Sequence, residues 1–180
     1  MGKRSNFERV PRDYYPTPVE AVKPLIDHLP YDKFDYVEPC AGDGRLVSHI
    51  GYLTEGQGNC VFMSDIQPRE EGIHEHDALD LYFNEEMADY CITNPPWDRS
   101  FLHPFIEHWL NLEIPTWLLF DADWVHTKQS SVYMTYISKI VSVGRVKWIE
   151  GSKNTGKDNC CWYLFDANKK TQTEFYGRLV

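Results

Sequence analysis

Helix-like and strand-like segments alternate along most of this 180-residue chain, and this order constrains its fold more than any other feature. Apolar residues recur at helical spacing from Val19 to Leu29, whereas Phe34 to Cys40 has the pattern of a short buried strand. Strands that alternate with helices favour a mainly parallel, doubly wound α/β sheet of the Rossmann-like kind. Helices are expected at 19–29, 45–52, 101–112 and, with weaker spacing, 132–137, and strands at 34–40, 60–64, 90–93 and 115–120.

The last two strand-like segments predict a different kind of connection. Ile140 to Ile149 and Cys160 to Phe165 are rich in residues that favour strands, and residues 150–159 between them are rich in Gly, Asn, Ser and Lys. This pattern is typical of an antiparallel hairpin. We therefore expect a sheet of about seven strands that ends in a C-terminal antiparallel hairpin.

The length fits one domain, which we expect to span residues 14–180. Residues 1–13 include Lys3, Arg4, Arg9 and Arg12, which predicts a flexible basic arm that is ordered by contact with a partner. The formal net charge of -9 argues against tight binding to a polyanion, because phosphate contacts usually supply most of that affinity. The basic residues therefore either form a rim around an acidic body or are scattered, solvated charge.

Cysteine usage and hydropathy bear on the environment of the protein. Five cysteines, an odd number, favour a reducing compartment, and no apolar run reaches the roughly 20 residues of a membrane span. A cytoplasmic protein without a membrane segment is therefore expected. His74, His76, Asp77 and Asp80 are candidate metal ligands, as are Cys160 and Cys161. Adjacent cysteines lack the two-residue spacing of a zinc knuckle and no matching pair occurs elsewhere, so no metal is predicted.

Asn94, Pro95, Pro96 and Trp97 directly follow the strand expected at 90–93. An exocyclic amine on an aromatic base is a poor nucleophile, so a site that uses it must accept its N–H groups and hold the base flat. The Asn94 side-chain oxygen and the Pro95 carbonyl can accept the two hydrogens, the prolines restrict the backbone, and Trp97 can stack on the base. The alternative is a turn that merely ends the strand.

A glycine turn follows the first expected strand and consists of Glu38-Pro39-Cys40-Ala41-Gly42-Asp43-Gly44. It lacks the full dinucleotide fingerprint, and Asp43 would repel a pyrophosphate at the start of the next helix. A cationic ligand fits better. S-adenosylmethionine carries a sulfonium and an ammonium that Glu38 and Asp43 can attract, while Gly42 and Gly44 allow close approach of the backbone.

Two more acids extend this expected cofactor site. Asp65 ends the second strand, about 23 residues beyond Gly42, where an acidic side chain typically pairs with ribose hydroxyls. Asp77 follows the third segment and can accept from the adenine amino group of the cofactor, with Ile66 and the Ala78 backbone as further contacts. Taken alone, each acid is as consistent with a solvated surface position as with a role in the site. Together, and in this order before Asn94, the acids favour a role in the site.

In this order the segments resemble the adenine-N6 DNA methyltransferases of the class I fold. The resemblance covers roughly the first hundred residues and includes Tyr15-Pro16-Thr17-Pro18, the glycine turn, Asp65, Asp77 and Asn94-Pro95-Pro96-Trp97. A Tyr-Pro-Thr-Pro segment ahead of the glycine turn is similar to the gamma group of that family. The resemblance implies that Thr17 and its neighbours contact the methionine carboxylate, and that Asn94 and Trp97 receive an adenine flipped out of the helix.

The C-terminal part departs from that family, because larger members of the gamma group carry a separate target-recognition domain. Sequence choice would then fall to the N-terminal arm, the segment 124–136, the hairpin loop, or a partner subunit, including a second copy of the chain. Trp124 is expected to border the substrate, and Trp148 to supply a second aromatic ring against the base. Packing roles are the alternative for both.

Three functions remain open at this point. The first is methyl transfer from S-adenosylmethionine to adenine N6 in DNA by direct in-line displacement. The second keeps this chemistry but changes the acceptor to RNA adenine or the amide of a protein glutamine, since Asn-Pro-Pro-aromatic is similar in all three groups. The third is a non-catalytic module that only binds cofactor, although such a module has no use for the amine clamp at Asn94.

Overall fold

The computed structural model describes residues 14–151, 155–169 and 172–178, so the expected basic arm at 1–13 lies outside the described residues. Among the described residues, no helix is both long and apolar enough to cross a bilayer. The strands are β1 (Phe34–Glu38), β2 (Gly58–Asp65), β3 (His74–Glu75), β4 (Tyr90–Thr93), β5 (Thr116–Asp121), β6 (Ile137–Arg145), β7 (Asn159–Phe165) and β8 (Glu174–Tyr176). The α-helices are α1 (Val19–Ile26), α2 (Arg45–Leu53) and α3 (Arg99–Asn111), and three 3-10 turns follow β5: η2 (Ala122–His126), η3 (Lys128–Val132) and η4 (Met134–Tyr136).

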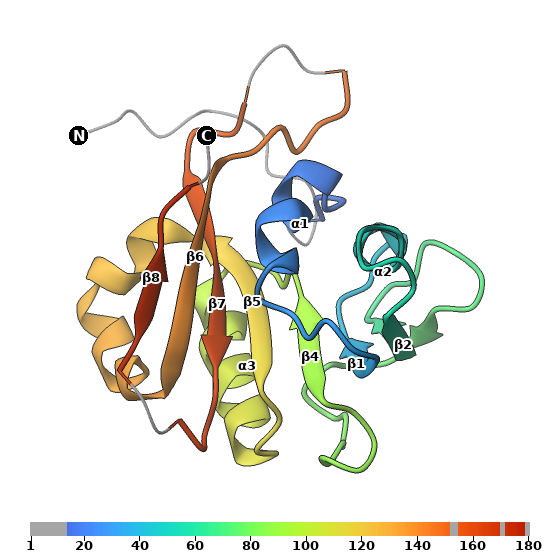
Figure 1. Ribbon diagram of the computed structural model, residues 1–180, viewed down its shortest axis with the longest axis horizontal. Coiled ribbons are helices and arrows are strands. Elements are labelled where there is room, and N and C mark those ends of the chain that lie inside the picture. Colours follow the sequence, from blue (N-terminus) through green and yellow to red (C-terminus); the bar gives the residue numbers. More distant parts are fainter. Residues whose placement is uncertain (1–13, 152–154, 170–171, 179–180) are drawn as a thin grey trace.

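The strands form one eight-stranded sheet in the order β3-β2-β1-β4-β5-β7-β6-β8 (Figure 1). Strands β1 to β5 pair in parallel, whereas β7 runs antiparallel to both β5 and β6. The expected doubly wound, mainly parallel sheet with a C-terminal antiparallel hairpin is therefore confirmed. It has eight strands rather than about seven, since β8 pairs in parallel with β6 at one edge.

Local spacing alone was misleading in one segment. The weak helical spacing over 132–137 predicts a helix, but the chain forms the turns η3 and η4 there and enters β6 at Ile137. Ile137 is fully buried and pairs with Phe165 of β7, so tertiary packing decides its conformation. The first hairpin strand accordingly runs from Ile137 to Arg145, not from Ile140 to Ile149.

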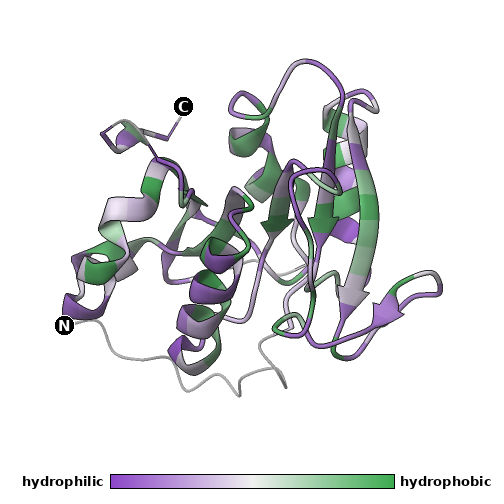
Figure 2. Cartoon of the chain, turned by 90° about the horizontal axis from the view of Figure 1, so that it is seen from below, coloured by the Kyte–Doolittle hydropathy of each residue, from purple (hydrophilic) through white to green (hydrophobic). Residues whose placement is uncertain are grey.

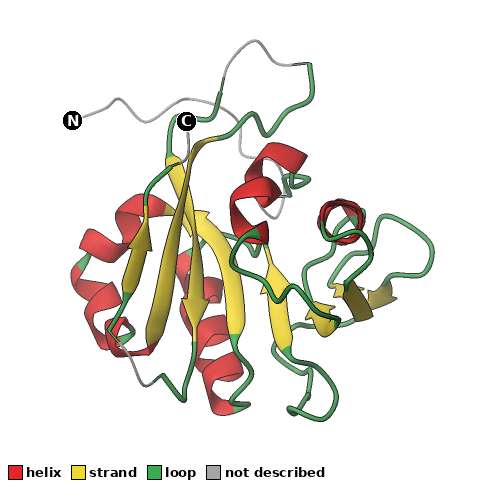
Figure 3. Cartoon of the chain, viewed as in Figure 1, coloured by secondary structure: helices red, strands yellow, loops and turns green. Residues whose placement is uncertain are grey.

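Helices cover both faces of the sheet, as Figures 1 and 3 show. The central strand β5 is buried on both sides: Trp117 and Leu119 belong to the core under α1 and α2, and Leu118 and Phe120 to the core under α3. Successive side chains on a strand point to opposite faces, which explains this division. In Figure 2 the hydrophobic residues are concentrated accordingly in the strands.

The strand order places a crevice in the sheet. The chain leaves β1 to build β2 and β3 on one side, then returns to form β4 on the other side of β1. Loops that leave the carboxyl ends of β1 and β4 therefore diverge, and ligands of open α/β sheets bind at such a switch point. The glycine turn follows β1 and the Asn94 segment follows β4, so both flank this crevice.

Candidate active site

A cavity of ≈ 610 Å³ lies at this switch point. Its wall comes from the segment before α1 and from the residues that follow β1, β2, β3 and β4. The predicted cofactor-site residues in the wall are Tyr15, Thr17, Glu38, Pro39, Ala41, Gly42, Asp43, Asp65, Ile66, Asp77, Ala78 and Asn94. Pro18 and Gly44, also predicted, adjoin wall residues without being part of the wall themselves.

The wall also contains residues that sequence reasoning missed. They are Tyr14, Pro16, Cys40, Leu46, Gln67, Arg69, Asp98 and Phe101. Tyr14 and Cys40 are immediate neighbours of predicted residues, so the motifs themselves pointed to their location. Arg69 and Phe101 carry no such signal, because their place in the wall depends on how the loops after β2 and β4 fold back.

The glycine turn is tied to the loop after β2. Gly42 has a φ of +57°, and its N–H donates to Asp65 Oδ2 at 2.9 Å. The other carboxylate oxygen, Oδ1, accepts from Gln67 N at 2.8 Å, and the Gly42 carbonyl accepts from Arg69 N at 3.0 Å. Asp65 thus holds two loops together, and a carboxylate with its ≈ four lone-pair sites keeps capacity for ribose hydroxyls.

Tyr14 covers Gly42. A β-carbon on Gly42 would lie 2.6 Å from Cε2 of the Tyr14 ring, so only glycine permits this contact. On the ring, the guanidinium carbon of Arg69 lies 3.7 Å from the centroid, a cation–π contact. Burial, followed by the nearby Asp43 carboxylate, raises the pKa of Tyr14 to about 12. Tyr14 and Arg69 therefore form one side of the cavity as a packed pair.

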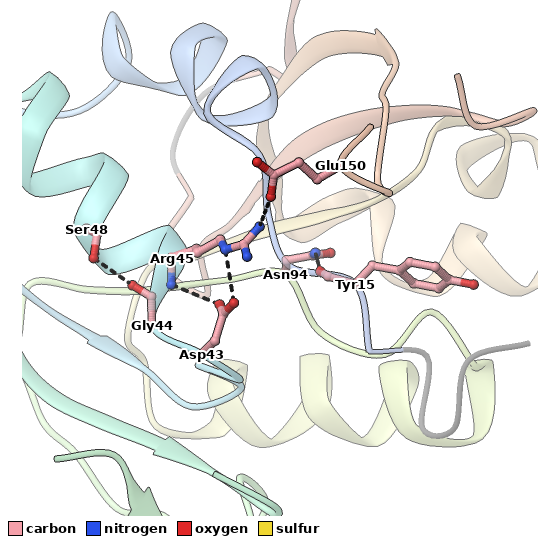
Figure 4. Close-up of polar contacts among 7 residues, drawn as sticks. All are labelled: Tyr15, Asp43, Gly44, Arg45, Ser48, Asn94 and Glu150. Atoms are coloured by element: carbon pink, nitrogen blue, oxygen red, sulfur yellow. Dashed lines mark hydrogen bonds and ion pairs between the residues drawn. The ribbon is translucent and has the colours of Figure 1, made fainter. Parts of the chain in front are cut away.

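Asp43 pairs with Arg45 at the start of α2, where Gly44 is the N-cap residue (Figure 4). Its carboxylate accepts from Arg45 N at 3.2 Å and lies 3.0 Å from the Arg45 side-chain Nε. Arg45 in turn approaches Glu150, in the connection after β6, at 3.8 Å. The Arg45 charge offsets that of Asp43, which leaves Glu38 as the acid better suited to attract a cation.

Glu38 is fully buried at the end of β1. Its Oε1 accepts from Thr93 Oγ1 at 2.5 Å and from Cys40 N at 3.3 Å, while Oε2 has no hydrogen-bond partner among the described residues. Burial raises the pKa of Glu38 to about 8, against the opposing effect of those two hydrogen bonds. An unpartnered, buried carboxyl oxygen in a cavity wall is suited to an ammonium group.

Asn94 connects the end of β4 to the segment before α1. Its Nδ2 donates to Thr17 Oγ1 at 3.1 Å and to the Tyr15 carbonyl at 3.4 Å, the latter drawn in Figure 4. Thr17 directly precedes Pro18, which is the N-cap residue of α1 and makes no side-chain cap. The Thr17 hydroxyl pairs with Asn94 rather than with the start of α1.

Trp97 is half-buried and turned towards the sheet. Its indole Nε1–H donates to Asn94 Oδ1 at 3.2 Å and to the Leu119 carbonyl of β5 at 3.1 Å. Trp148 meets the Trp97 ring edge to face, with centroids 5.7 Å apart and planes at 87°. The two rings are adjacent, but neither is part of the cavity wall. Pro96 is part of that wall, whereas Pro95 is buried and is not.

Trp124 does not border this cavity, which corrects the expectation for it. Its side chain is 1% exposed and packs against Phe120, Tyr163 and Phe165, while its Nε1 donates to His103 Nε2 at 3.1 Å. The reason is that η2 turns back over the sheet directly after β5, so the packing alternative holds.

No group of three or more His, Cys, Asp or Glu side chains is placed to hold a metal ion among the described residues. The wall of the cavity offers five acidic side chains, two side-chain amides, the Arg69 guanidinium, backbone groups of a glycine turn, and the rings of Tyr14, Tyr15 and Phe101. This set suits an organic ligand that combines a cationic group with an aromatic base.

Comparison with known proteins identifies the fold. The sequence matches no protein-family model and no curated protein sequence. The structure is similar to a type I restriction-modification methyltransferase subunit from Streptococcus thermophilus, with TM-score 0.63, 12% identity, and coverage of 91% of this chain and 47% of that one. It is also similar to a proposed RNA methyltransferase from Pyrococcus horikoshii, with TM-score 0.56, 14% identity, and coverage of 86% and 87%.

A dimethyladenosine transferase from Plasmodium falciparum is a third such neighbour, with TM-score 0.57, 16% identity, and coverage of 85% of this chain and 62% of that one. The chain therefore spans about half of the Streptococcus protein and most of the Pyrococcus protein. These similarities establish that the chain has the fold of the class I methyltransferases.

Proposed function

We propose that the protein transfers a methyl group from S-adenosylmethionine to the exocyclic N6 amine of adenine in DNA. One observation carries this proposal: the Asn94 side chain and the glycine turn, from opposite sides of the switch point, line the same cavity. A cofactor at the turn and an amine at Asn94 would therefore meet in one space. The fold, shared with methyltransferases, is consistent with that chemistry.

The residues at the turn suit the cofactor. Oε2 of Glu38 is an unpartnered acceptor suited to the ammonium of the methionine moiety, and Gly42, without a β-carbon, lets the Tyr14 ring pack against the turn. Asp65 keeps acceptor capacity for the ribose, and Ile66 and Ala78 line the wall as apolar contacts for the adenine ring. When bound, S-adenosylmethionine would supply an electrophilic methyl on its sulfonium.

Asn94 would hold the acceptor. Its Oδ1 accepts one N–H of the amine and so increases electron density on the nitrogen, while the Pro95 carbonyl accepts the other. The cofactor would supply its methyl to the nitrogen that Asn94 and the Pro95 carbonyl hold and would leave as a neutral thioether, and the extra proton on nitrogen would pass to water. Most of the rate enhancement would come from holding the two reactants in line.

The choice of DNA rests on the resemblance of the motifs rather than on the fold, since the structural neighbours include both a restriction-modification methyltransferase subunit and a proposed RNA methyltransferase. RNA adenine and the protein glutamine amide share the amine chemistry and remain outcomes of the test, as does a cofactor-binding module without transfer. Recognition of a target sequence would fall to the N-terminal arm, the segment 124–136, the hairpin loop, or a partner subunit, including a second copy of the chain.

The test is transfer of labelled methyl from S-adenosylmethionine to duplex DNA, single-stranded DNA, RNA and extract protein. The control is Asn94→Ala, with cofactor affinity measured in parallel by calorimetry. Label recovered as N6-methyladenine in DNA and absent with the variant, at unchanged cofactor affinity, supports the proposal. Label in RNA or protein reassigns the acceptor, and cofactor binding without any transfer overturns the enzymatic proposal.

A further inference from the structure

The hydrogen-bonding capacity of the Asn94 side chain is almost fully used within the protein. A carboxamide has two N–H donors and an oxygen with two lone pairs. Both donors have partners, at Thr17 Oγ1 (3.1 Å) and the Tyr15 carbonyl (3.4 Å). One oxygen lone pair accepts from Trp97 Nε1 at 3.2 Å. What remains for a ligand is a single acceptor position.

These partners also fix which way the amide points. If the amide were rotated by half a turn, its oxygen would face the Tyr15 carbonyl, and its nitrogen would face the indole N–H of Trp97. The first pair would be two acceptors and the second two donors. Leaving such groups unpaired costs about 1–3 kcal/mol each. The Thr17 hydroxyl can donate or accept, so Tyr15 and Trp97 set the direction, and the hydrogen bond to Thr17 holds the amide in place.

The Trp97 indole is itself held in place. Its N–H is shared between Asn94 Oδ1 and the Leu119 carbonyl, which belongs to the buried central strand β5. Trp148 packs edge to face on the ring. A phenylalanine at position 97 would keep an aromatic ring but would lack the donor, so the indole nitrogen has a role distinct from stacking.

We propose that Trp97 and Thr17 are positioning residues that lock the Asn94 amide in one orientation, and that this restricts the acceptor to a group that donates an N–H. The inference rests on the proposed function for its catalytic meaning. A base that presents only a carbonyl oxygen, such as the O6 edge of guanine or the O4 edge of thymine, finds no donor at Asn94. An amine or a primary amide donates an N–H and so finds the free acceptor position on Asn94 Oδ1.

The test separates orientation from turnover. Trp97→Phe removes the indole N–H and keeps a ring, Thr17→Val removes the hydroxyl at equal size, and Thr17→Ser keeps the hydroxyl. Trp124→Phe is the matched control, because it removes an indole hydrogen bond to His103 that lies outside the cavity wall. The first readout is hydrogen exchange of the Asn94 side-chain N–H₂ by NMR, assigned by its loss in Asn94→Ala.

We expect exchange at Asn94 to become about tenfold faster or more in Trp97→Phe and Thr17→Val, equivalent to about 1.4 kcal/mol of lost protection. Thr17→Ser recovers slow exchange, and Trp124→Phe leaves it unchanged. Equal exchange rates in wild type, Trp97→Phe and Thr17→Val would overturn the inference. This readout needs neither cofactor nor acceptor, so it stands even if the wild-type protein transfers no methyl to DNA.

The second readout is the kinetics of transfer to the acceptor identified above. Because orientation matters where the amine reacts, kcat falls about tenfold or more in Trp97→Phe and Thr17→Val, with KM for the acceptor nearly constant. Thr17→Ser recovers most of the loss. A fall in kcat without faster exchange at Asn94 would contradict the positioning role while leaving the proposed function intact.

Discussion

Replacing Glu38 by Gln is expected to remove a pH-dependent cost of folding. The carboxyl is fully buried, and burial raises its pKa to about 8 from an ordinary value of 4.5. In the unfolded chain it ionises near the ordinary value. Between these two pH values the unfolded state has therefore lost a proton that the folded state still carries, so rising pH favours unfolding.

The structure sets the size of this effect. Each pH unit within the window changes the free energy of unfolding by about 1.4 kcal/mol, which gives about 5 kcal/mol between pH 4.5 and 8. Below pH 4.5 Glu38 is protonated in both the folded and the unfolded state, and above pH 8 it is ionised in both. Outside this window Glu38 therefore adds no further pH dependence to the free energy of unfolding. Glu38→Gln keeps the shape and removes the ionisation. The new amide nitrogen would take the position of Oε2, where it has no hydrogen-bond partner among the described residues. The resulting loss of folding free energy does not depend on pH.

The assay is urea unfolding of both proteins at intervals from pH 5 to 8. Other titrating groups are common to the two proteins and cancel in the difference. We expect the stability of Glu38→Gln relative to wild type to rise by about 4 kcal/mol from pH 5 to pH 8. Glu20→Gln, which removes one exposed carboxylate from α1, controls for the loss of a formal charge. Parallel stability curves for wild type and Glu38→Gln would refute the reasoning.

Three further outcomes are expected. Cofactor affinity of the wild type rises from pH 6 to 8, because Glu38 must ionise to face an ammonium, and calorimetry should find no such rise in Glu38→Gln. Gly42→Ala lowers cofactor affinity about tenfold or more in the same assay, because φ is +57° and the new β-carbon would displace the Tyr14 ring. An unchanged affinity would show that Tyr14 does not contribute to cofactor binding. Trp124→Phe lowers the free energy of urea unfolding by about 1–3 kcal/mol but leaves DNA affinity unchanged, because the side chain is buried and bonded to His103. Weaker DNA binding without a loss of stability would instead show that Trp124 contacts the substrate.

The parts of the site that the sequence predicts are the parts built from short, local motifs. The glycine turn and the Asn94 segment each directly follow a buried strand, and parallel strands bring their carboxyl ends to one edge of the sheet. Periodicity and turn residues are therefore sufficient to place both at one cavity. The fold class follows from the same alternation, which is why the doubly wound sheet and its hairpin were predictable.

The misses are contacts between residues far apart in the chain. Arg69 reaches the Tyr14 ring only because the loop after β2 hydrogen-bonds back to the glycine turn. Thr17 satisfies a local rule for helix capping, but its hydroxyl pairs with Asn94, 77 residues away. Strand β3 has two residues, too few to show a period. Trp124 follows the sequence order of the site, yet the 3-10 turn η2 directs its side chain into the core.

The end of β4 links both halves of the site through two consecutive residues. Thr93 donates to Glu38 in the glycine turn, and Asn94 donates to Thr17 in the segment before α1. Thr93 pairs with Leu118 of β5, and Trp97 reaches back to the Leu119 carbonyl of the same strand. Glu38, which suits the cofactor, and Asn94, which suits the acceptor, are thus both held in place by contacts with the buried strands β4 and β5. Because in-line transfer tolerates little displacement, a strand rather than a loop is the appropriate support for both groups.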